Sequence, residues 1–578
     1  MFKLFRKARI NKGLVTLLLV FTTLQMVGTL LLPTLTANII NDGVMLMDMD
    51  YVVRTGGVMI LVATATGIFS ILATYFSTEL ATIFSARIRS KLFVKTQELS
   101  YQDFQEFQTS SLITRATNDI EQVQTTISMF FEQMLPAPFI IIIGMILAFS
   151  RDGYMALIIM ISTFLLVIVF GILVKKIFPL FVSTQKSLDH INRTVGQYLS
   201  GIRIIRAFNR SKLDQEKMDQ SFVDFANINI KINRLFAIMM PLVMLLMSLS
   251  TVAIVWFGGH RINSGNLEIG DIMAIIEYAM NILMYVLMAI FAAIYFPRAK
   301  VCANRILEIL EFRPEIIDGK SQIDAAEELS LKFENVSFSY KQAEEPVLKN
   351  ISFSCKKGMT TAIIGGTGSG KSTIARLLLR LLDTSHGKIA LNGQSIKELT
   401  QKELRERIGI VPQKAFLFSG TIAENLRHGR EKASLDEMKK AAYVAQAEKF
   451  IMQLPDKYDS LVSQGGKNFS GGQRQRLAIA RMLIKKPNIY VFDDSFSALD
   501  FKTDANLRKA LKKVTKNDIV INIAQRISTI KDADQIIVLD NGEMAGIGTH
   551  KELLKNCELY LEIAKSQLST EELANELK

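Results

Sequence analysis

The sequence predicts a membrane α-helical domain, with six transmembrane helices that extend into the cytosol, followed by an α/β domain built around a phosphate-binding loop. Three observations support this fold class. Of the 578 residues, 49% are hydrophobic, and the apolar residues are concentrated before residue 300. Six apolar segments in that half are long enough to cross a bilayer, which takes about 20 helical residues. After residue 300, strand-like and helical patterns alternate around a glycine-rich loop.

The six apolar segments are the predicted spans of a transmembrane domain that covers residues 14–310. Lysines and arginines gather at the N-terminus and after spans two and four, whereas each of the other three connections carries one arginine. Because positive charge accumulates on the cytosolic side, both termini of this multi-pass protein are expected to be cytosolic. Buried helices of a soluble protein would not show this alternation. The spans run from Leu14 to Ile40, Val58 to Leu80, Met129 to Phe149, Tyr154 to Val174, Phe236 to Phe257 and Ile272 to Phe296.

The excess of basic residues has a topological explanation. A net charge of +13 would suggest nucleic-acid binding in a soluble protein. Here much of that charge marks the inner ends of the spans, so no nucleic-acid partner is expected. Residues 1–13 are basic with interleaved apolar side chains, which predicts an amphipathic helix on the inner leaflet rather than a signal peptide. Cys302, Cys355 and Cys557 follow no metal-ligand spacing and are expected to be reduced thiols.

A phosphate-binding loop is the most specific motif of the second half. It follows an apolar β-branched run, 360–364, and precedes a helical pattern that reaches Leu381. Strand, glycine loop and helix together favour phosphate binding over a flexible linker, because backbone N–H groups and the helix N-terminus attract anions. Lys371 is expected to reach the β- and γ-phosphates, and Ser372 to bind Mg²⁺. The loop consists of Gly365, Gly366, Thr367, Gly368, Ser369, Gly370, Lys371, Ser372 and Thr373.

Further elements follow in an order that suits an ATP-binding domain. Residues 331–340 alternate as a strand that ends at Tyr340, and Gln413 follows another short strand. An apolar strand, 489–492, leads into Asp493 and Asp494, as in the second metal-binding element of phosphate-loop ATPases. The predicted boundaries are a linker at 311–330, a nucleotide-binding domain at 331–566 and a polar C-terminal tail at 567–578.

The run Ser470-Gly471-Gly472-Gln473, between the phosphate loop and the acidic strand end, resembles the signature of ATP-binding-cassette (ABC) proteins. The six spans ahead of it resemble those of an exporter-type half-transporter, so the resemblance covers nearly the whole chain. It implies that two nucleotide-binding domains meet head to tail, with each ATP between the phosphate loop of one domain and the signature of the other. One chain carries one such domain and six spans, so the resemblance implies a dimer.

The resemblance also implies roles for individual residues. Tyr340 would stack on adenine, the loop Gly365 to Thr373 would hold the phosphates, and Ser372, Gln413 and Asp493 would contact Mg²⁺. Asp500 lies in the segment that would cross to the partner's site. The residues that would face the γ-phosphate bound to the partner are Ser470, Gly471, Gly472 and Gln473.

Two residues depart from the family pattern. Asp494 stands where a glutamate usually acts as general base, and its carboxylate is set back by about 1.5 Å, one C–C bond. Gln525 replaces the usual histidine and cannot carry a positive charge. A misplaced base can cost about 10²-fold in rate, so we expect this site to bind ATP and hydrolyse it poorly.

An intact signature beside a poor base resembles the degenerate-site subunit of heterodimeric bacterial multidrug exporters. A partner half-transporter with the usual glutamate and histidine would then provide the competent site. Other possibilities are a homodimeric exporter or flippase of lipid or peptide, and an ATP-gated channel. A soluble ATPase of DNA repair shares the motifs but not the six spans.

Clues to the substrate lie in two spans. Glu277, Asn281, Met284, Tyr285 and Met288 share one face of span six, and an intramembrane acid with soft methionines would suit small hydrophobic or amphipathic cations. Glu277 is near the outer end of its span, so snorkelling to the surface is an equal alternative. Glu132 and Gln133 in span three are expected near the outer mouth or in a continuation of the inner loop.

Overall fold

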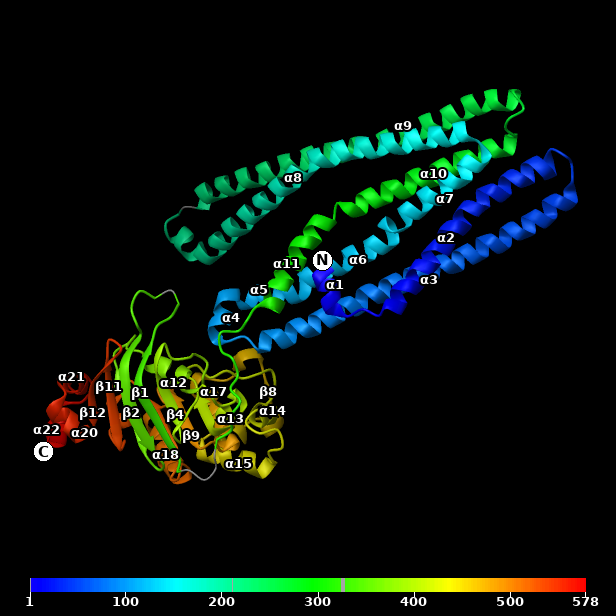
Figure 1. Ribbon diagram of the computed structural model, residues 1–578. Coiled ribbons are helices and arrows are strands. Elements are labelled where there is room, and N and C mark those ends of the chain that lie inside the picture. The colour runs from blue at the N-terminus through cyan, green and yellow to red at the C-terminus, as the bar shows by residue number, and fades with distance from the viewer. Residues whose placement is uncertain (1, 210, 324–327, 342, 578) are drawn as a thin grey trace. The chain divides into compact units, whose positions relative to one another are not determined.

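The computed structural model describes residues 2–209, 211–323, 328–341 and 343–577 (Figure 1). The chain forms two compact units: Met1–Glu98 with Phe107–Phe312, and Leu99–Glu106 with Arg313–Lys578. A short segment between the second and third predicted spans, Leu99–Glu106, therefore belongs to the second unit. We describe each unit by itself.

The first unit is entirely helical in its regular structure. Its helices are α1 (Phe2–Ala8), α2 (Lys12–Asn38), the π-helix η1 (Ile39–Val44), α3 (Met49–Gln97), α4 (Tyr101–Phe107, whose first six residues belong to the second unit), α5 (Thr109–Thr114), the π-helix η2 (Arg115–Asp119), α6 (Ile120–Met129), the π-helix η3 (Phe130–Met134), α7 (Pro136–Arg151), α8 (Gly153–Ala207), α9 (Ser211–Asn263), α10 (Ile269–Ala293) and α11 (Phe296–Glu311).

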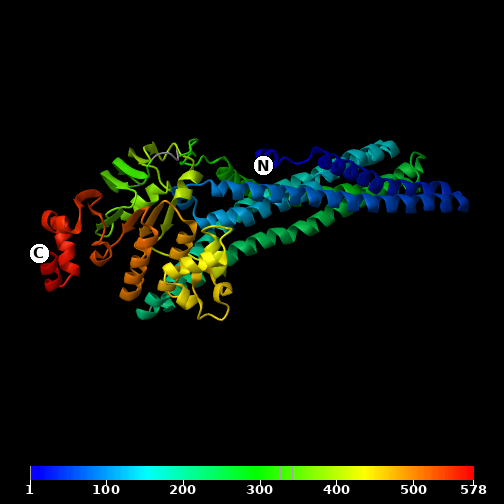
Figure 2. The same ribbon diagram turned by 90° about the horizontal axis from the view of Figure 1, so that it is seen from below.

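Among the described residues, six helical stretches are long and apolar enough to cross a membrane, and each contains one of the predicted spans. The prediction of six transmembrane helices is confirmed. The stretches have 33 to 55 residues, far more than the roughly 20 that a bilayer requires. At 1.5 Å per residue the longest extends about 80 Å, so the helices continue well beyond the hydrocarbon core. Figure 2 shows these helices running in roughly one common direction.

Helix α10 is the most buried span of the bundle. Tyr278 and Ile282 are completely buried, and the Tyr278 hydroxyl lies 2.6 Å from Thr34 Oγ1 of α2. Close packing depends on small residues: a Cβ at Gly144 of α7 would lie 2.8 Å from Ile282 Cδ1. At one end of the bundle, Arg151 pairs with Asp271 at 2.9 Å and Arg261 with Asp152 at 2.6 Å.

The N-terminal helix differs from the one expected. α1 ends at Ala8, because Arg9 takes a left-handed conformation with φ of 49°. Leu4 and Ala8 are buried, Phe5 stacks on Phe84 of α3, and Arg87 donates to the Ala8 carbonyl at 3.2 Å. Apolar side chains of this segment therefore pack on protein, which the inner-leaflet interpretation did not foresee.

The second unit contains two main sheets. A six-stranded sheet has the order β12-β11-β3-β10-β9-β6, parallel except for β12. An antiparallel sheet has the order β2-β1-β4-β5, and β7 pairs with β8. The strands are β1 (Ser330–Phe338), β2 (Leu348–Lys356), β3 (Thr360–Gly365), β4 (His386–Leu391), β5 (Gln394–Ser395), β6 (Ile408–Val411), β7 (Gly420–Thr421), β8 (Leu461–Val462), β9 (Ile489–Asp493), β10 (Ile519–Ile523), β11 (Gln535–Asp540) and β12 (Glu543–Gly548).

The helices of the second unit alternate with these strands along the chain. They are α12 (Lys371–Leu378), α13 (Gln401–Arg407), α14 (Ile422–Arg427), α15 (Leu435–Val444), α16 (Glu448–Ile451), α17 (Gly471–Lys485), α18 (Phe501–Val514), α19 (Ile527–Ile530), α20 (His550–Asn556), α21 (Glu558–Gln567) and α22 (Thr570–Leu577), with short 3₁₀ turns at Lys457–Asp459 and Gln464–Gly466. α12 ends before the predicted Leu381, because Arg380 is left-handed with φ of 50°.

The parallel register decides where the motifs meet. Ile523 of β10 pairs with Asp493 of β9 and with Ile363 of β3. Since parallel strands end at the same edge of a sheet, the phosphate loop, the acidic pair and the segment after β10 are neighbours there. Ligands of open α/β sheets bind at this edge.

Candidate ATP-binding site

The phosphate loop connects β3 to α12 and depends on glycine at specific positions. Gly368 and Gly370 have φ of 86° and 94°, values that only glycine adopts readily. A Cβ at Gly365 would lie 2.2 Å from the Leu539 carbonyl oxygen, and one at Gly370 would lie 2.5 Å from Leu348 Cδ2. Bare backbone therefore lines the approach to the N-terminus of α12, where N–H groups favour phosphate.

Lys371 folds over this loop. Its ammonium donates to the Gly365 carbonyl at 2.9 Å and lies 3.3 Å from Ser369 Oγ. Burial lowers its pKa, and the charges of Asp494 and Asp493 oppose that change. The side chain is thus held at the place where phosphate oxygens would approach, with two carboxylates favouring its charged form.

Ser372 and Asp493 form the pair expected to hold Mg²⁺. Ser372 Oγ donates to Asp493 Oδ1 at 3.0 Å. Burial raises the pKa of Asp493, and the hydrogen bond from Ser372 opposes the rise. A hydroxyl beside a carboxylate offers the hard oxygen ligands that Mg²⁺ prefers, so these residues fit the ion. When bound, Mg²⁺ would neutralise charge on the β- and γ-phosphates.

The carboxylate of Asp494 is held by two amides. Gln413 Nε2 donates to its Oδ2 at 3.0 Å, and Gln525 Nε2 donates to the same oxygen at 3.4 Å. Asp494 itself has a left-handed backbone with φ of 48°, and its N–H donates to the Ile523 carbonyl. The structure therefore brings Gln413 to Asp494, whereas the sequence-based hypothesis assigned it to Mg²⁺ beside Asp493.

The signature residues form the N-terminus of α17. Ser470 Oγ accepts from the Gln473 N–H at 3.2 Å, and Gln473 Oε1 accepts from the Ser470 N–H at 2.9 Å. This capping box engages Oε1 of Gln473, a residue that the resemblance placed facing a γ-phosphate. Ser470 and Gly471 are exposed, and a Cβ at Gly471 would meet nothing within 4 Å. The end of the helix is open to an anion from outside.

Asp500 also caps a helix. Its carboxylate accepts from the Thr503 N–H at 2.9 Å at the start of α18, and these hydrogen bonds lower its pKa. Asp500 lies between β9 and α18, and the capping bond was not foreseen from the sequence.

Comparison with known proteins agrees with this arrangement. Residues 15–287 match the model of the ABC transporter transmembrane region, and residues 348–497 match that of the ABC transporter. An ABC transporter ATP-binding protein of Mycobacterium tuberculosis is 38% identical over 96% of both chains. This chain belongs to the ABC transporter family. YfiB of Bacillus subtilis, another ABC transporter ATP-binding protein, is also 38% identical over 96% of both chains.

The fold of the transporter is that of an exporter. A solved bacterial Atm1-family ABC exporter with ATP bound superposes with a TM-score of 0.82 and 24% identity, covering 96% of this chain and 99% of that one. The chain therefore has the fold of an exporter-type half-transporter with an ATP-binding domain. Its apolar helices are those of a multi-pass membrane protein, and the relatives named here are bacterial.

Two residues that adjoin the predicted adenine-stacking residue Tyr340 were missed from the sequence. Arg376 Nη1 donates to the Tyr340 hydroxyl at 3.1 Å, and its guanidinium lies 5.0 Å from the ring centre of Tyr101. Arg376 could have been found, because it follows Ser372 by one helical turn. Tyr101 could not, since it belongs to the first inner loop and no local pattern connects it with the nucleotide motifs.

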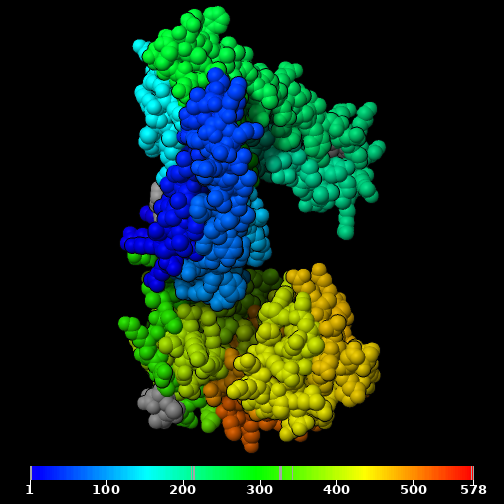
Figure 3. All heavy atoms as spheres, turned by 90° about the vertical axis from the view of Figure 1, so that its right-hand side faces the viewer, coloured from blue at the N-terminus to red at the C-terminus, as the bar shows by residue number. Residues whose placement is uncertain are grey.

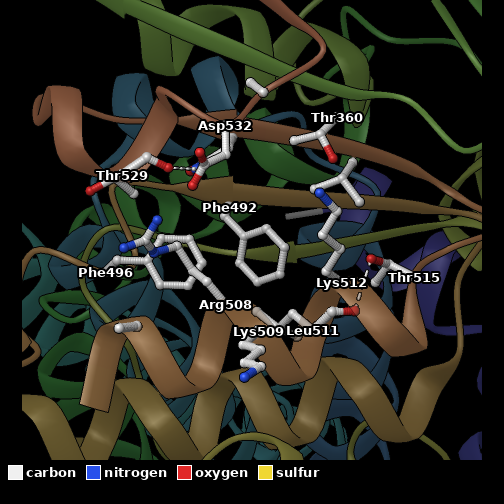
Figure 4. Close-up of a pocket in the computed structure, with 14 residues that line it drawn as sticks. Thr360, Phe492, Phe496, Arg508, Lys509, Leu511, Lys512, Thr515, Thr529 and Asp532 are labelled. Carbon is white, nitrogen blue, oxygen red and sulfur yellow. Dashed lines mark hydrogen bonds between the residues drawn. The ribbon is translucent and has the colours of Figure 1, made fainter. Parts of the chain in front are cut away.

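A separate cavity of about 390 Å³ lies beneath β9 and β10, beside α18 (Figure 4). Phe492 and Phe496 line it with their rings, and Lys512 and Asp532 also line it. The buried Asn522 Oδ1, which has no hydrogen-bond partner among the described residues, also belongs to it. No residue of the phosphate loop or signature lines this cavity, so it is distinct from the ATP site.

The residues proposed for substrate lie on exposed or half-buried faces of the transporter's spans. On α10, Glu277, Met284 and Met288 are exposed, and Asn281 and Tyr285 are half-buried. Glu132 is exposed within the π-helix η3 and accepts from Ser77 Oγ of α3 at 3.2 Å. About 28 Å of helix separates Glu132 from Arg151, so the two residues lie toward opposite ends of the same helical stretch.

Proposed function

We propose that this chain is one subunit of a heterodimeric ABC exporter, and that its own site binds ATP and hydrolyses it slowly. The observation that supports this most is the Asp494 carboxylate with both Gln413 and Gln525 amides donating to one oxygen. A general base needs a free, basic oxygen aimed at water. Two donors already occupy Oδ2, and the short aspartate side chain cannot extend past them.

The second half of the argument concerns charge. A histidine at position 525 could become an imidazolium next to the γ-phosphate, whereas the carboxamide of Gln525 remains neutral. Transition-state stabilisation by a preorganised charge is therefore reduced. Gln525 can still donate a hydrogen bond to phosphate, and the loop Gly365 to Thr373 is complete. Binding of ATP is retained while hydrolysis is slowed.

The end of α8 and the start of α9 give a second argument for a partner subunit. These two helices form an arm that projects from the rest of the helical unit (Figure 3). Leu199, Ile204 and Phe208 near its tip are 66%, 65% and 74% exposed. Leu199 lies about 70 Å of helix from Gly153, too far for contact with a hydrocarbon core about 30 Å thick. Exposed apolar side chains this far from the hydrocarbon core need a protein partner to cover them.

We propose that the partner is a second half-transporter that carries the usual glutamate and histidine. This chain would complete the competent site with its open signature, Ser470 to Gln473. The proposed cargo is hydrophobic or amphipathic compounds, cations among them, because Glu277 lies between the exposed Met273 and Met280 on α10. We place the subunit in the cell membrane with both termini in the cytosol.

The test is purification of this chain with and without its partner. We expect a second, different half-transporter to copurify at one to one, and we expect little ATPase activity from the chain alone. Robust turnover by a homodimer, abolished by Asp494→Asn, would contradict the proposal and favour a homodimeric exporter or flippase. Uphill transport into inverted vesicles would distinguish an exporter from an ATP-gated channel. An unchanged efflux of every cationic dye tested with Glu277→Gln would remove that residue from the cargo path.

A further inference from the structure

The last residue of α21, Gln567, makes two hydrogen bonds to the segment that carries Gln525. Its Nε2 donates to the Gln525 carbonyl at 2.8 Å, and its Oε1 accepts from the Ile527 N–H at 2.9 Å. One carboxamide thus spans three consecutive residues in the manner of a strand neighbour. Gln567 is 40 residues after Ile527 in the chain, so this contact is tertiary.

The segment needs such support because it lies between regular elements. β10 ends at Ile523 and α19 begins at Ile527, whose N–H is one of the unpaired donors at a helix start. Arg526, at the N-cap position, supplies no side-chain cap. Its guanidinium instead donates to the Ser497 carbonyl at 3.1 Å. Gln567 therefore satisfies the backbone on one side while Arg526 attaches the segment to the residues after Asp494 on the other.

The C-terminal helices that carry Gln567 are themselves anchored. Ala564 and Tyr560 of α21 are completely buried, and the Tyr560 hydroxyl lies 2.7 Å from His550 Nδ1. In α22, Glu576 pairs with Lys531, just after α19, at 3.0 Å. What the sequence suggested was a polar tail, 567–578, is in its described part a packed helix preceded by a residue that contacts the ATP site.

We infer that Gln567 is a positioning residue of the ATP site. It fixes the backbone at 525–527 so that the Gln525 side chain stays at Asp494, and α21 thereby controls how firmly this subunit retains ATP. The inference rests on the proposed function, in which Gln525 faces the γ-phosphate. It extends that function by making residues 558–567 part of the nucleotide-retaining machinery.

The experiment uses the purified complex of this chain and its partner. Nucleotide bound in this chain's site is labelled with radioactive 8-azido-ATP, and its release is followed by photo-cross-linking after a chase with unlabelled ATP. Gln567→Leu removes both hydrogen bonds at similar volume and is expected to speed release about fivefold, the effect of one net hydrogen bond. Gln567→Glu keeps the acceptor for Ile527 but sets a carboxylate against the Gln525 carbonyl, so release is expected to be accelerated as well.

A matched control and a double-mutant cycle separate positioning from general stability. Lys565→Ala changes an exposed residue of the same helix and is expected to leave release and thermal unfolding unchanged. Gln567→Leu is then combined with Gln525→Ala. A positioning residue acts through Gln525, so the double variant should release ATP no faster than Gln525→Ala alone. The inference would be overturned if Gln567→Leu accelerated ATP release equally in the parent protein and in Gln525→Ala. It would also be overturned if Gln567→Leu left release unchanged.

Failure of the proposed function would look different. If the chain hydrolyses ATP efficiently as a homodimer, kcat and KM are measured for Gln567→Leu, Gln525→Ala and the double variant. Gln567→Leu is then expected to change kcat only in the protein that retains Gln525. Rapid ATP turnover by the homodimer thus contradicts the proposed slow hydrolysis at this site. Additive effects of the two substitutions contradict the positioning role of Gln567.

Discussion

Gln413 donates a 3.0 Å hydrogen bond from Nε2 to Oδ2 of Asp494, the oxygen that Gln525 also contacts. Gln413 follows β6, Asp494 follows β9 and Gln525 follows β10, so three strand ends of one parallel sheet meet at a single carboxylate. The residue that should activate water is engaged by two neutral donors. We therefore expect reactivity at this site to depend on what surrounds Asp494 as well as on the length of its side chain.

Restoring the usual residues should increase hydrolysis. Asp494→Glu combined with Gln525→His extends the carboxylate by about 1.5 Å and returns an ionisable group to the γ-phosphate side. We expect ATPase activity of this site to rise by about 10²-fold when the partner's own general base is disabled. Asp494→Asn serves as the matched control and should stay at background. An unchanged rate in the double variant would show that the slow step lies elsewhere.

The contact between Arg376 and Tyr340 should support nucleotide binding. Arg376→Met removes the 3.1 Å hydrogen bond and the stacking on Tyr101, and we expect ATP to bind about five- to tenfold more weakly. Tyr340→Phe deletes only the hydroxyl and should have the smaller effect. Fluorescent ATP titration measures both.

The ion pair between Asp152 and Arg261 should stabilise the helical unit. Asp152 has only 2% of its side chain exposed and also caps α8 by accepting from the N–H groups of Tyr154 and Met155. Arg261→Met leaves that carboxylate buried without its counter-ion, at a cost of about 3 kcal/mol. We expect a lower thermal midpoint in detergent, and partial recovery when Asp152→Asn is added. A midpoint equal to that of the parent protein would contradict this role.

Acid should loosen the C-terminal helices through His550. Burial lowers the pKa of His550, with the nearby Glu576 and Asp532 opposing this shift and Lys531 and Lys551 adding to it. Its partner Tyr560 has a pKa raised by burial. At a pH above the ordinary histidine pKa of about 6.5, the His550 imidazole is neutral in both the folded and the unfolded protein. Its contribution to the free energy of unfolding therefore does not change with pH in that range. Below it the unfolded form takes a proton that the folded form resists, and stability falls.

Hydrogen–deuterium exchange measures this effect. Exchange in α20 to α22, corrected for the intrinsic pH dependence, should become faster at pH 5.5 than at pH 7.5. His550→Gln, which cannot titrate, should remove the difference. A difference that persists in that variant would assign the pH dependence to another group.

Much of this protein follows from local patterns in its sequence. The six spans were predictable because a stretch of apolar residues long enough to cross a bilayer is a local property. The phosphate loop was recognisable because its glycines, Lys371 and Ser372 are consecutive. The departures at Asp494 and Gln525 were visible for the same reason, since each follows a strand in a recognisable motif.

Contacts between distant segments had no such local signal. Tyr101 lies in the first inner loop yet groups with the nucleotide-binding unit, and Gln567 ends a helix near the C-terminus yet contacts Gln525. Arg376 lies on the predicted helix, but its partners Tyr101 and Tyr340 come from other elements. Hydrogen bonds of this kind depend on where folding brings backbone and side chain together.

The sequence by itself determined the membrane topology pattern, the order of the ATP motifs and the presence of a short base at Asp494. Only the tertiary structure decided that Gln413 and Gln525 converge on that base and that Gln567 holds the backbone beside it. The physical reason is the parallel sheet: its register aligns the carboxyl ends of β6, β9 and β10, which are separated by tens of residues in the chain.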